Sequence, residues 1–441
     1  VGDPYFPRAG NGGYDVTGYD IQIRYDTTTG RLEGHTTITA QATESLSRFN
    51  LDLRLATSAV TVDDQPARIR QDGGELQVTP ARPVLAGQPM VVRVDYAGVP
   101  SDIPAGDGDG GTEPWRRTAD GAVAAGEPES AAWWYPSNDH PSDKAAVAVT
   151  ATVPAGVEAI SNGALLGGPE PAGPGWETWR WQAKEPMATY LAFVAIGQYD
   201  IVRRDTPAGP YLAAYAQGLT PEVAAAARSS VERTPEIASF LAGIFGPYPF
   251  SNLGGVVPDA PDMGFALENQ ARPVYSPAFF LTGDENIRVV VHELAHQWFG
   301  DSVSVRHWRD IWLNEGFATY AEWLYTERTG GASAQQTAVA RYARLPADAD
   351  FWRIPPGDPG AARVLDGAIY SRGAMALQAL RAKVGDEDFF TALRTWTTER
   401  RGGNGTVADF LAVVERVSGE QVDDVAQAWL FSPTRPPAPP G

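Results

Sequence analysis

The first half of the chain alternates apolar and polar residues in the manner of β-strands. From residue 14 to about residue 98, runs such as 19–25 (YDIQIRY) and 90–96 (MVVRVDY) are separated by turns rich in Gly, Asp and Pro, and similar runs return at 144–153 and 176–201. Successive side chains of a strand point to opposite faces, so each run can bury one face. The pattern predicts an N-terminal all-β domain built from two packed sheets.

The second half has the longer period of helices. A stretch rich in Gly, Asp and Pro at residues 101–130 interrupts the strands and is long enough to be a functional loop. Residues 220–222 (TPE) open a helix, short strands are predicted at 253–257 and 270–275, and helices dominate beyond residue 330. We predict a multidomain α+β chain with a β domain at residues 1–205, a mainly helical domain with a small sheet at 206–431, and a disordered Pro-rich tail at 432–441.

Two helices are predicted around a group of chemically active side chains. The first carries the signals of a capping box at Thr282 and Glu285, and Gly300 follows its last turn. The second runs from about residue 310 to near residue 330. The apolar positions of the first helix form one stripe, which predicts that most of it is buried: Ile287, Val290, Val291, Leu294, Ala295 and Trp298.

The first helix contains two histidines four residues apart, His292 and His296. At that spacing both imidazoles lie on one helix face, about 6 Å apart, and can reach one metal ion. A catalytic zinc takes three protein ligands and keeps a fourth position open for water, and Glu315 on the second helix can supply the third ligand. Metal ligation also compensates for burying polar groups. The sequence therefore predicts one Zn²⁺ per chain, held by His292, His296 and Glu315.

Glu293 follows the first histidine directly and gives this site its chemistry. A zinc ion with three protein ligands lowers the pKa of a bound water to about 7. A carboxylate beside that water can take its proton and later deliver one to a leaving amine. With only five histidines in the chain, a chance His-Glu-x-x-His pattern is a poor explanation. The motif predicts a metal-dependent peptidase.

The composition narrows the classes of partner. The formal charge of −19 and the pI near 4.7 argue against a nucleic-acid partner, because the long-range field repels phosphate. No apolar run reaches the roughly 18 residues that a membrane span needs, so no integral membrane segment is predicted. The absence of cysteine excludes disulfides and a thiolate-ligated zinc. The chain begins at Val1 without an initiator methionine, which favours a processed, secreted protein and leaves a cytoplasmic one open; no oligomeric state is predicted.

Four segments of the chain resemble one known family of enzymes. They are residues 292–301 (HELAHQWFGD), 312–320 (WLNEGFATY), 265–269 (FALEN) and 369–373 (IYSRG). In order and spacing they are similar to the gluzincin aminopeptidases, which include alanyl aminopeptidase and leukotriene hydrolase. The resemblance implies a saddle-like N-terminal β domain and a thermolysin-like zinc domain, in a short form without the C-terminal helical-repeat domain of larger members. It also implies peptide substrates with a free N-terminus.

The resemblance assigns roles to residues near the zinc. It implies that Glu293 is the general base and that the hydroxyl of Tyr370 stabilises the oxyanion. The alternative for Tyr370 is an ordinary buried aromatic residue. Glu322 resembles an acid that stands behind a zinc-binding histidine, and a solvated carboxylate on a helix surface is the equally weighted alternative.

The resemblance also implies a pocket for the substrate's α-amino group. Glu268 corresponds to the acid that binds this group, with Ala266 and Asn269 in the same substrate-binding segment. Glu129 resembles a second amine-binding acid contributed by the β domain. Glu127 is a rival for that second role, because the alignment there needs a small deletion.

Three functions remain to be compared. The leading hypothesis is a zinc aminopeptidase, in which a carboxylate pocket selects the free N-terminus. A thermolysin-like endopeptidase with an open cleft would use the same zinc site but cleave N-terminally blocked peptides, and Glu268 argues against it. The third hypothesis is an inactive peptide-binding protein on the same scaffold, which the intact catalytic set makes a poor explanation.

Overall fold

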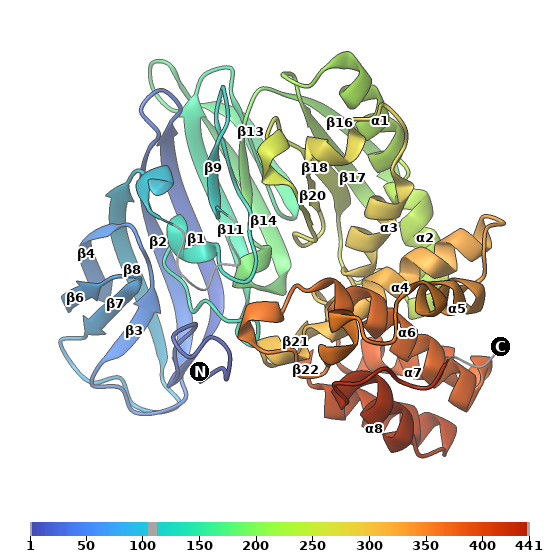
Figure 1. Ribbon diagram of the computed structural model, residues 1–441. Coiled ribbons are helices and arrows are strands. Elements are labelled where there is room, and N and C mark those ends of the chain that lie inside the picture. Colours follow the sequence, from blue (N-terminus) through green and yellow to red (C-terminus); the bar gives the residue numbers. More distant parts are fainter. Residues whose placement is uncertain (1, 105–112, 439–441) are drawn as a thin grey trace. The chain divides into compact units, whose positions relative to one another are not determined.

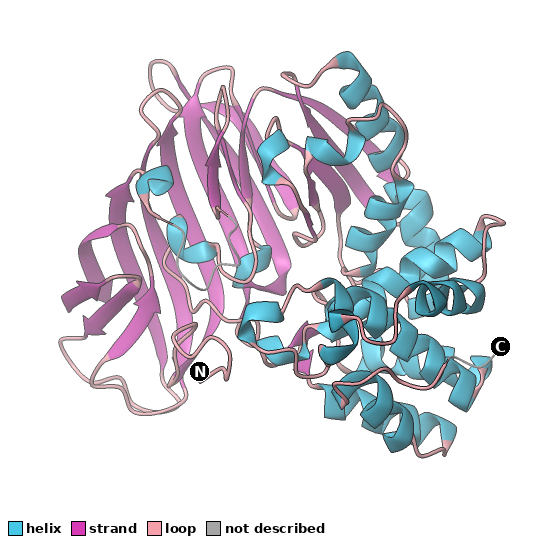
Figure 2. Cartoon of the chain, viewed as in Figure 1, coloured by secondary structure: helices cyan, strands magenta, loops and turns pink. Residues whose placement is uncertain are grey.

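The computed structural model describes residues 2–104 and 113–438. The chain packs into two compact units, one formed by Val1–Glu232 and Phe250–Asn286 and the other by Arg233–Pro249 and Ile287–Gly441. Strands make up most of the first unit and helices most of the second, as the magenta and cyan elements of Figure 2 show. The predicted α+β class, a β-rich N-terminal region followed by a mainly helical one, is confirmed.

The largest sheet of the β unit has eight strands in the order β13-β14-β11-β1-β2-β8-β4-β5 (Figure 1). Its neighbouring strands β11 and β1 are parallel, and its other pairs are antiparallel. Every second residue of β11 is buried, which is the alternation that the sequence predicts. The strands are β1 (Tyr14–Asp26), β2 (Arg31–Ala42), β4 (Ala56–Val62), β5 (Gln65–Pro66), β8 (Pro89–Gly98), β11 (Lys144–Pro154), β13 (Ala164–Pro171) and β14 (Trp176–Ala188).

Two smaller sheets complete the region that the sequence assigned to a two-sheet domain. One contains β3 (Phe49–Asp52), β7 (Glu75–Thr79) and β6 (Arg68–Asp72), in that order. The other contains β12 (Glu158–Ser161), β15 (Val194–Gly197), β10 (Ala122–Ala124) and β9 (Trp115–Arg117). The last two strands lie inside the stretch predicted as a loop, because residues such as Trp115 and Val123 are buried there; residues 105–112 of that stretch lie outside the described residues.

A five-stranded sheet, also within the β unit, has the strand order β16-β17-β18-β20-β19. The sequence analysis assigned the strands near residues 253–257 and 270–275 to the helical domain. In the structure they share one sheet with the hairpin of β16 and β17. The division into compact units therefore does not follow the predicted domain boundary near residue 205, and that boundary stays a prediction. The elements are β16 (Tyr199–Thr206), β17 (Gly209–Ala216), β18 (Leu253–Val257), β19 (Ala266–Leu267), β20 (Val274–Tyr275) and the helix α1 (Pro221–Val231), which Thr220 caps as predicted.

The second unit is built around α4, whose residues are buried from Trp312 to Tyr325. Its helices are α2 (Thr234–Phe245), α3 (Ile287–Ala295), α4 (Trp312–Arg328), α5 (Ala334–Arg344), α6 (Gly367–Val384), α7 (Asp386–Glu399), α8 (Val407–Ser418) and α9 (Asp423–Ala426). Two short strands, β21 (Ser304–Val305) and β22 (Asn404–Gly405), pair in parallel. Within residues 2–104 and 113–438, no helix combines the length and the apolar character that crossing a membrane requires.

Helix α3 begins at Ile287, later than the sequence predicted. Glu285 accepts a hydrogen bond from a serine of α1 and does not cap α3. The backbone amide of Asn286 donates to the hydroxyl of another α1 residue, Ser230, at 2.9 Å. The predicted capping box at residues 282–285 is therefore wrong, because this stretch bonds to a helix that precedes it by more than fifty residues.

The C-terminal residues pack against α6 through Arg372, which is fully buried. Burial lowers the pKa of this guanidinium to about 10. Tyr342 of α5 donates a hydrogen bond to the carbonyl of Pro436 at 2.7 Å. These contacts correct the predicted disordered tail over residues 432–438, while residues 439–441 lie outside the described residues. Arg372 donates to five backbone carbonyls at 2.6–3.2 Å, those of Trp352, Ile354, Ala428, Trp429 and Ser432.

Candidate active site

Three side chains of the helical unit converge at the end of α3. The nitrogen and oxygen atoms that His292, His296 and Glu315 could offer a metal all lie within 4.8 Å of one another. Oε2 of Glu315 is 3.2 Å from Nε2 of His292 and 3.5 Å from Nε2 of His296. His292 lies on α3, His296 directly follows its last residue, and Glu315 lies in the first turn of α4. The structure thus brings together the three residues predicted to bind zinc.

Hydrogen bonds fix the orientation of both imidazole rings. Nδ1 of His296 lies 3.0 Å from the carbonyl of Phe299, to which it can donate its proton. Nδ1 of His292 is 2.8 Å from Oε1 of Glu322, and the other oxygen of Glu322 is 2.9 Å from the guanidinium of Arg288. The side chain of Glu322 is only 8% exposed, so it is not a solvated surface carboxylate. Both rings therefore turn Nε2 toward Glu315.

The side chains of this cluster shift one another's pKa values. Burial alone would raise the pKa of Glu315, but the neighbouring imidazoles of His296 and His292 lower it to about 2. Burial opposes a charge on His292, and its hydrogen bonds to Glu315 and Glu322 outweigh that effect and raise its pKa well above the ordinary value. A metal cation binds an imidazole nitrogen only in its unprotonated form, so metal and proton compete for Nε2 of His292.

The cluster suits zinc. Two imidazole nitrogens and one carboxylate form a donor set of catalytic zinc sites, which keep a further position for water. Hydrogen bonds from Nδ1 to a carbonyl or a carboxylate are the usual support for zinc-binding histidines, because they fix the tautomer and make the ring a better donor. His292 and His296 each have such a support.

Two further predicted residues adjoin these ligands. Glu293 lies next to His292 on α3 and is 5% exposed. Tyr370, on α6, stacks its ring on that of His292 with 5.9 Å between centroids and 18° between planes. Tyr370 is partly exposed, which does not fit the alternative of a buried core aromatic. A carboxylate and a phenol therefore come from residues that adjoin His292, one along the helix and one by ring stacking.

In the β unit, Glu268 begins a short buried segment after β19. Its carboxylate accepts a hydrogen bond from the hydroxyl of Tyr190 at 3.0 Å, and the side-chain amide of Asn269 donates to the carbonyl of Leu191 at 3.0 Å. Glu268 and Asn269 are at most 2% exposed, whereas Ala266 in β19 is partly exposed. The predicted substrate-binding residues thus lie in one segment that is fixed to the turn before β15.

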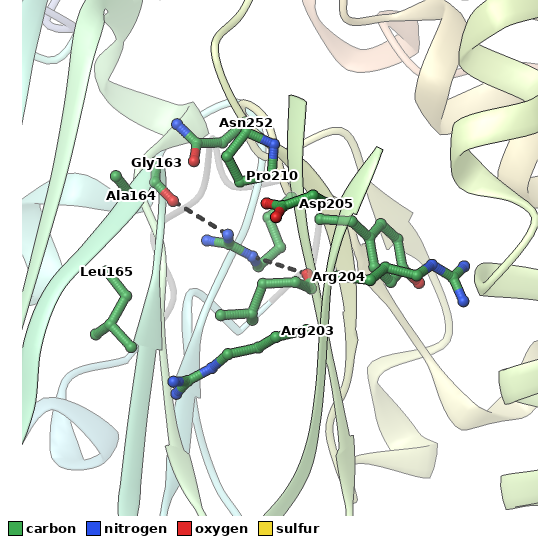
Figure 3. Close-up of a pocket in the computed structure, with 11 residues that line it drawn as sticks. Gly163, Ala164, Leu165, Arg203, Arg204, Asp205, Pro210 and Asn252 are labelled. Carbon is green, nitrogen blue, oxygen red and sulfur yellow. Dashed lines mark hydrogen bonds between the residues drawn. The ribbon is translucent and has the colours of Figure 1, made fainter. Parts of the chain in front are cut away.

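Arg272 anchors the end of this segment. Its buried guanidinium donates to the carbonyls of Gly163 and Leu212 at 3.1 and 3.2 Å, and also to a carbonyl of β12. The dashed line that ends at Gly163 in Figure 3 marks the first of these bonds. The amide of Asn162 donates to the carbonyl of Gln270 at 3.0 Å. Arg272 also borders a cavity of about 490 Å³. The backbone around Glu268 is therefore held from both ends.

No sequence pattern pointed to Tyr190 or Arg272. Tyr190 bonds to Glu268 across 78 positions of the chain, and Arg272 bonds to Leu212 across 60 positions. Local spacing therefore carries no signal for either residue. Between Glu268 and Arg272, Ala271 has a φ of 65°, a conformation that favours glycine. A local hydrogen bond closes this turn, because the backbone amide of Arg272 donates to the carbonyl of Asn269 at 2.9 Å.

Glu129 lies in different surroundings from Glu268. Its carboxylate is 3.7 Å from the guanidinium of Arg54, and it lines a cavity of about 570 Å³ together with acids that include Asp139. Burial raises the pKa of Glu129, and Arg54 partly opposes this effect. The rival residue, Glu127, is also buried. Both remain predictions for a second amine-binding acid.

Comparison with known proteins identifies the family of these two units. The Peptidase family M1 domain matches residues 230–429, and the Peptidase M1 N-terminal domain matches residues 16–191. Aminopeptidase M1-B of Oryza sativa subsp. japonica is 27% identical over 435 residues, which are 93% of this chain and 49% of that protein. Glutamyl aminopeptidase of Homo sapiens is 28% identical over 323 residues, which are 69% of this chain and 33% of that protein. The chain therefore spans between a third and a half of the length of these curated relatives.

Solved structures match the chain over its whole length. An M1 zinc metallopeptidase from Deinococcus radiodurans has a TM-score of 0.88 at 31% identity, covering 100% of this chain and 98% of that one. A mutant of the Deinococcus peptidase bound to a Tyr-Ser-Ala substrate has a TM-score of 0.87, at 31% identity and with 100% and 99% coverage. A two-domain M1 zinc metallopeptidase mutant bound to L-arginine has a TM-score of 0.88, with the same identity and coverage. The family domains cover most of the chain, and the donor set fits the metal: the chain belongs to the zinc metallopeptidases of peptidase family M1.

Proposed function

We propose that the protein is a zinc-dependent aminopeptidase that removes the N-terminal residue from peptides. The cluster of His292, His296 and Glu315, with its potential ligand atoms within 4.8 Å, carries this proposal. The matched relatives from rice and human are aminopeptidases by name, which supports the exopeptidase class. When bound to these three side chains, zinc supplies a Lewis acid for the scissile carbonyl and a water with a pKa of about 7.

Glu293 transfers the proton, and Tyr370 stabilises the negative charge that develops on the carbonyl oxygen. Because Glu293 adjoins His292, its carboxylate takes the proton of the attacking water and returns a proton to the leaving amine. The hydroxyl of Tyr370 donates a hydrogen bond to the oxyanion of the tetrahedral intermediate. Its stacking on His292 supports this role, because it ties the phenol to a metal ligand.

Glu268 binds the ammonium group of the substrate's first residue. Its burial favours a strong charge-assisted bond, because a desolvated carboxylate is screened less than an exposed one. The hydrogen bond from Tyr190 holds the carboxylate in one orientation. An internal peptide segment has no ammonium to pair with this acid, so cleavage within a chain is disfavoured.

Replacing Glu268 with Gln tests the aminopeptidase assignment. The amide keeps the size of the side chain and an acceptor for Tyr190, but it loses the charge. We expect kcat/KM for free-amine substrates to fall ten- to a hundredfold, about 1.5–3 kcal/mol for one charge-assisted contact. Hydrolysis of the same peptides with an acetylated N-terminus should change far less. The measurement is kcat/KM for matched free and acetylated chromogenic peptides.

Glu127→Gln and Glu129→Gln are the matched variants for the second acid. The one that binds the ammonium should reproduce the selective loss seen with Glu268→Gln, and the other should stay near the wild type. Equal losses on free and acetylated peptides for Glu268→Gln would contradict the amine pocket. An endopeptidase that shares the zinc site would then be the better assignment.

Tyr370→Phe tests the proposed oxyanion donor. The variant keeps the ring that stacks on His292 and removes only the hydroxyl. We expect kcat to fall roughly 10²-fold with little change in KM, because the hydrogen bond forms chiefly in the transition state. Steady-state kinetics at zinc saturation measure both constants. A raised KM with an unchanged kcat would show that Tyr370 is only a binding residue.

A further inference from the structure

Helices α4 and α6 cross at two glycines, Gly316 and Gly373. A Cβ atom added to Gly316 would lie 3.1 Å from the Cα and the carbonyl carbon of Gly373. One added to Gly373 would lie 3.1 Å from the Cα of Gly316. Carbon atoms in ordinary contact stay about 3.5–4.0 Å apart, so an added methyl group has to push one backbone away from the other. The absence of side chains at both positions thus permits this short separation between the helices.

The crossing adjoins two groups of the proposed active site. Gly316 directly follows Glu315 on α4, and Gly373 lies three residues after Tyr370 on α6, less than one helical turn away. The ring of Tyr370 stacks on His292, which itself lies 3.2 Å from Glu315. A change in the separation of α4 and α6 therefore moves the phenol relative to the metal ligands.

Other contacts hold each helix in place. On α4, the ring of Phe317 stacks on Phe299 with 4.4 Å between centroids and meets Phe410 edge-on at 5.1 Å. On α6, Arg372 is bound to the five carbonyls described above. Because both helices are fixed by these contacts, a small outward movement at the crossing has no easy way to be absorbed.

We propose that Gly316 and Gly373 are positioning residues for catalysis. Their contact sets the distance between the helix that carries Tyr370 and the helix that carries Glu315, and so holds the phenol where the oxyanion forms. The inference rests on the proposed role of Tyr370.

The test compares two glycines of the same helix. Gly373→Ala places a methyl group against the backbone of α4, whereas Gly367→Ala places one where no atom lies within 4 Å. A displacement of 1 Å can cost about 10²-fold in rate, so a few tenths of an ångström should lower kcat of Gly373→Ala roughly tenfold. KM and zinc content should stay close to the wild type. Gly367→Ala should match the wild type in all three measurements.

A double-mutant cycle with Tyr370→Phe separates positioning from a general loss of structure. If Gly373→Ala acts by moving the hydroxyl, it should lower kcat no more than about twofold in the Tyr370→Phe background. The same tenfold loss in both backgrounds would overturn the proposal, as would a wild-type kcat for Gly373→Ala. A native kcat for Tyr370→Phe alone would instead overturn the proposed role of Tyr370.

Gly316→Ala provides the second variant if Gly373→Ala does not fold. Its methyl group enters the same crossing from α4 and meets the backbone of Gly373. The expected result is again a loss of kcat that disappears in the Tyr370→Phe background. A loss of zinc from Gly316→Ala would place its effect on Glu315, and the proposal for the phenol would be wrong.

Discussion

Glu293→Gln should retain zinc, and its kcat should fall about 10²–10⁴-fold, because the amide keeps the shape of the side chain but cannot carry the proton. Glu293 is buried beside His292, so the isosteric change leaves the packing of α3 intact. The loss should appear in kcat and kcat/KM alike, since proton transfer belongs to the chemical step. Steady-state kinetics and metal analysis of the purified variant measure the two properties separately.

Glu322→Gln is the matched control for this variant. It makes the same chemical change at another buried acid of the cluster, where the amide oxygen can still accept the hydrogen bond from His292. We expect a roughly 10–100-fold weaker zinc affinity and a smaller effect on kcat at saturating zinc. A near-native rate for Glu293→Gln would refute its role as the general base.

His296→Ala should bind far less than one zinc per chain, and its activity should fall below about 10⁻³ of the wild type. One of three ligands is removed, and the remaining His292 and Glu315 are left 3.2 Å apart with no second imidazole to complete the site. Metal analysis after dialysis measures the loss, and circular dichroism checks that the helices persist. Added zinc should restore little activity, because only two of the three protein ligands remain.

Phe299→Leu serves as the control for His296→Ala. It keeps the backbone carbonyl that supports His296 while changing the neighbouring core, so it separates loss of a ligand from loss of packing. We expect this control to be less stable than the wild type but to bind zinc. Stoichiometric zinc in His296→Ala would show that the metal is held by other residues.

The spacing of residues along one helix made the metal cluster predictable. Helical geometry converts a four-residue interval into neighbouring side chains, so His292 and His296 could be placed together from the sequence alone. Glu315 could be added because catalytic zinc needs a third donor, and the structure brings it within 3.5 Å of both rings. In the same way, a two-residue alternation predicted the buried face of β11.

Contacts between distant residues could not be predicted in this way. The capping signal at Glu285 has the right local pattern, but its carboxylate bonds to α1 instead. The tail at residues 432–438 is rich in proline, and Arg372 and Tyr342 nevertheless fix its backbone. For the same reason Tyr190, which orients Glu268 from 78 positions earlier in the chain, had no signal in the sequence.

The carbonyl acceptors of Arg372 become available at different stages of chain growth. Two of them precede the arginine by 20 and 18 positions, whereas the last, that of Ser432, follows it by 60. During synthesis α6 is therefore made well before it can complete these bonds. The phenol of Tyr370, two residues from Arg372, therefore lies on a helix whose bond to Ser432 can form only after 60 further residues have been made.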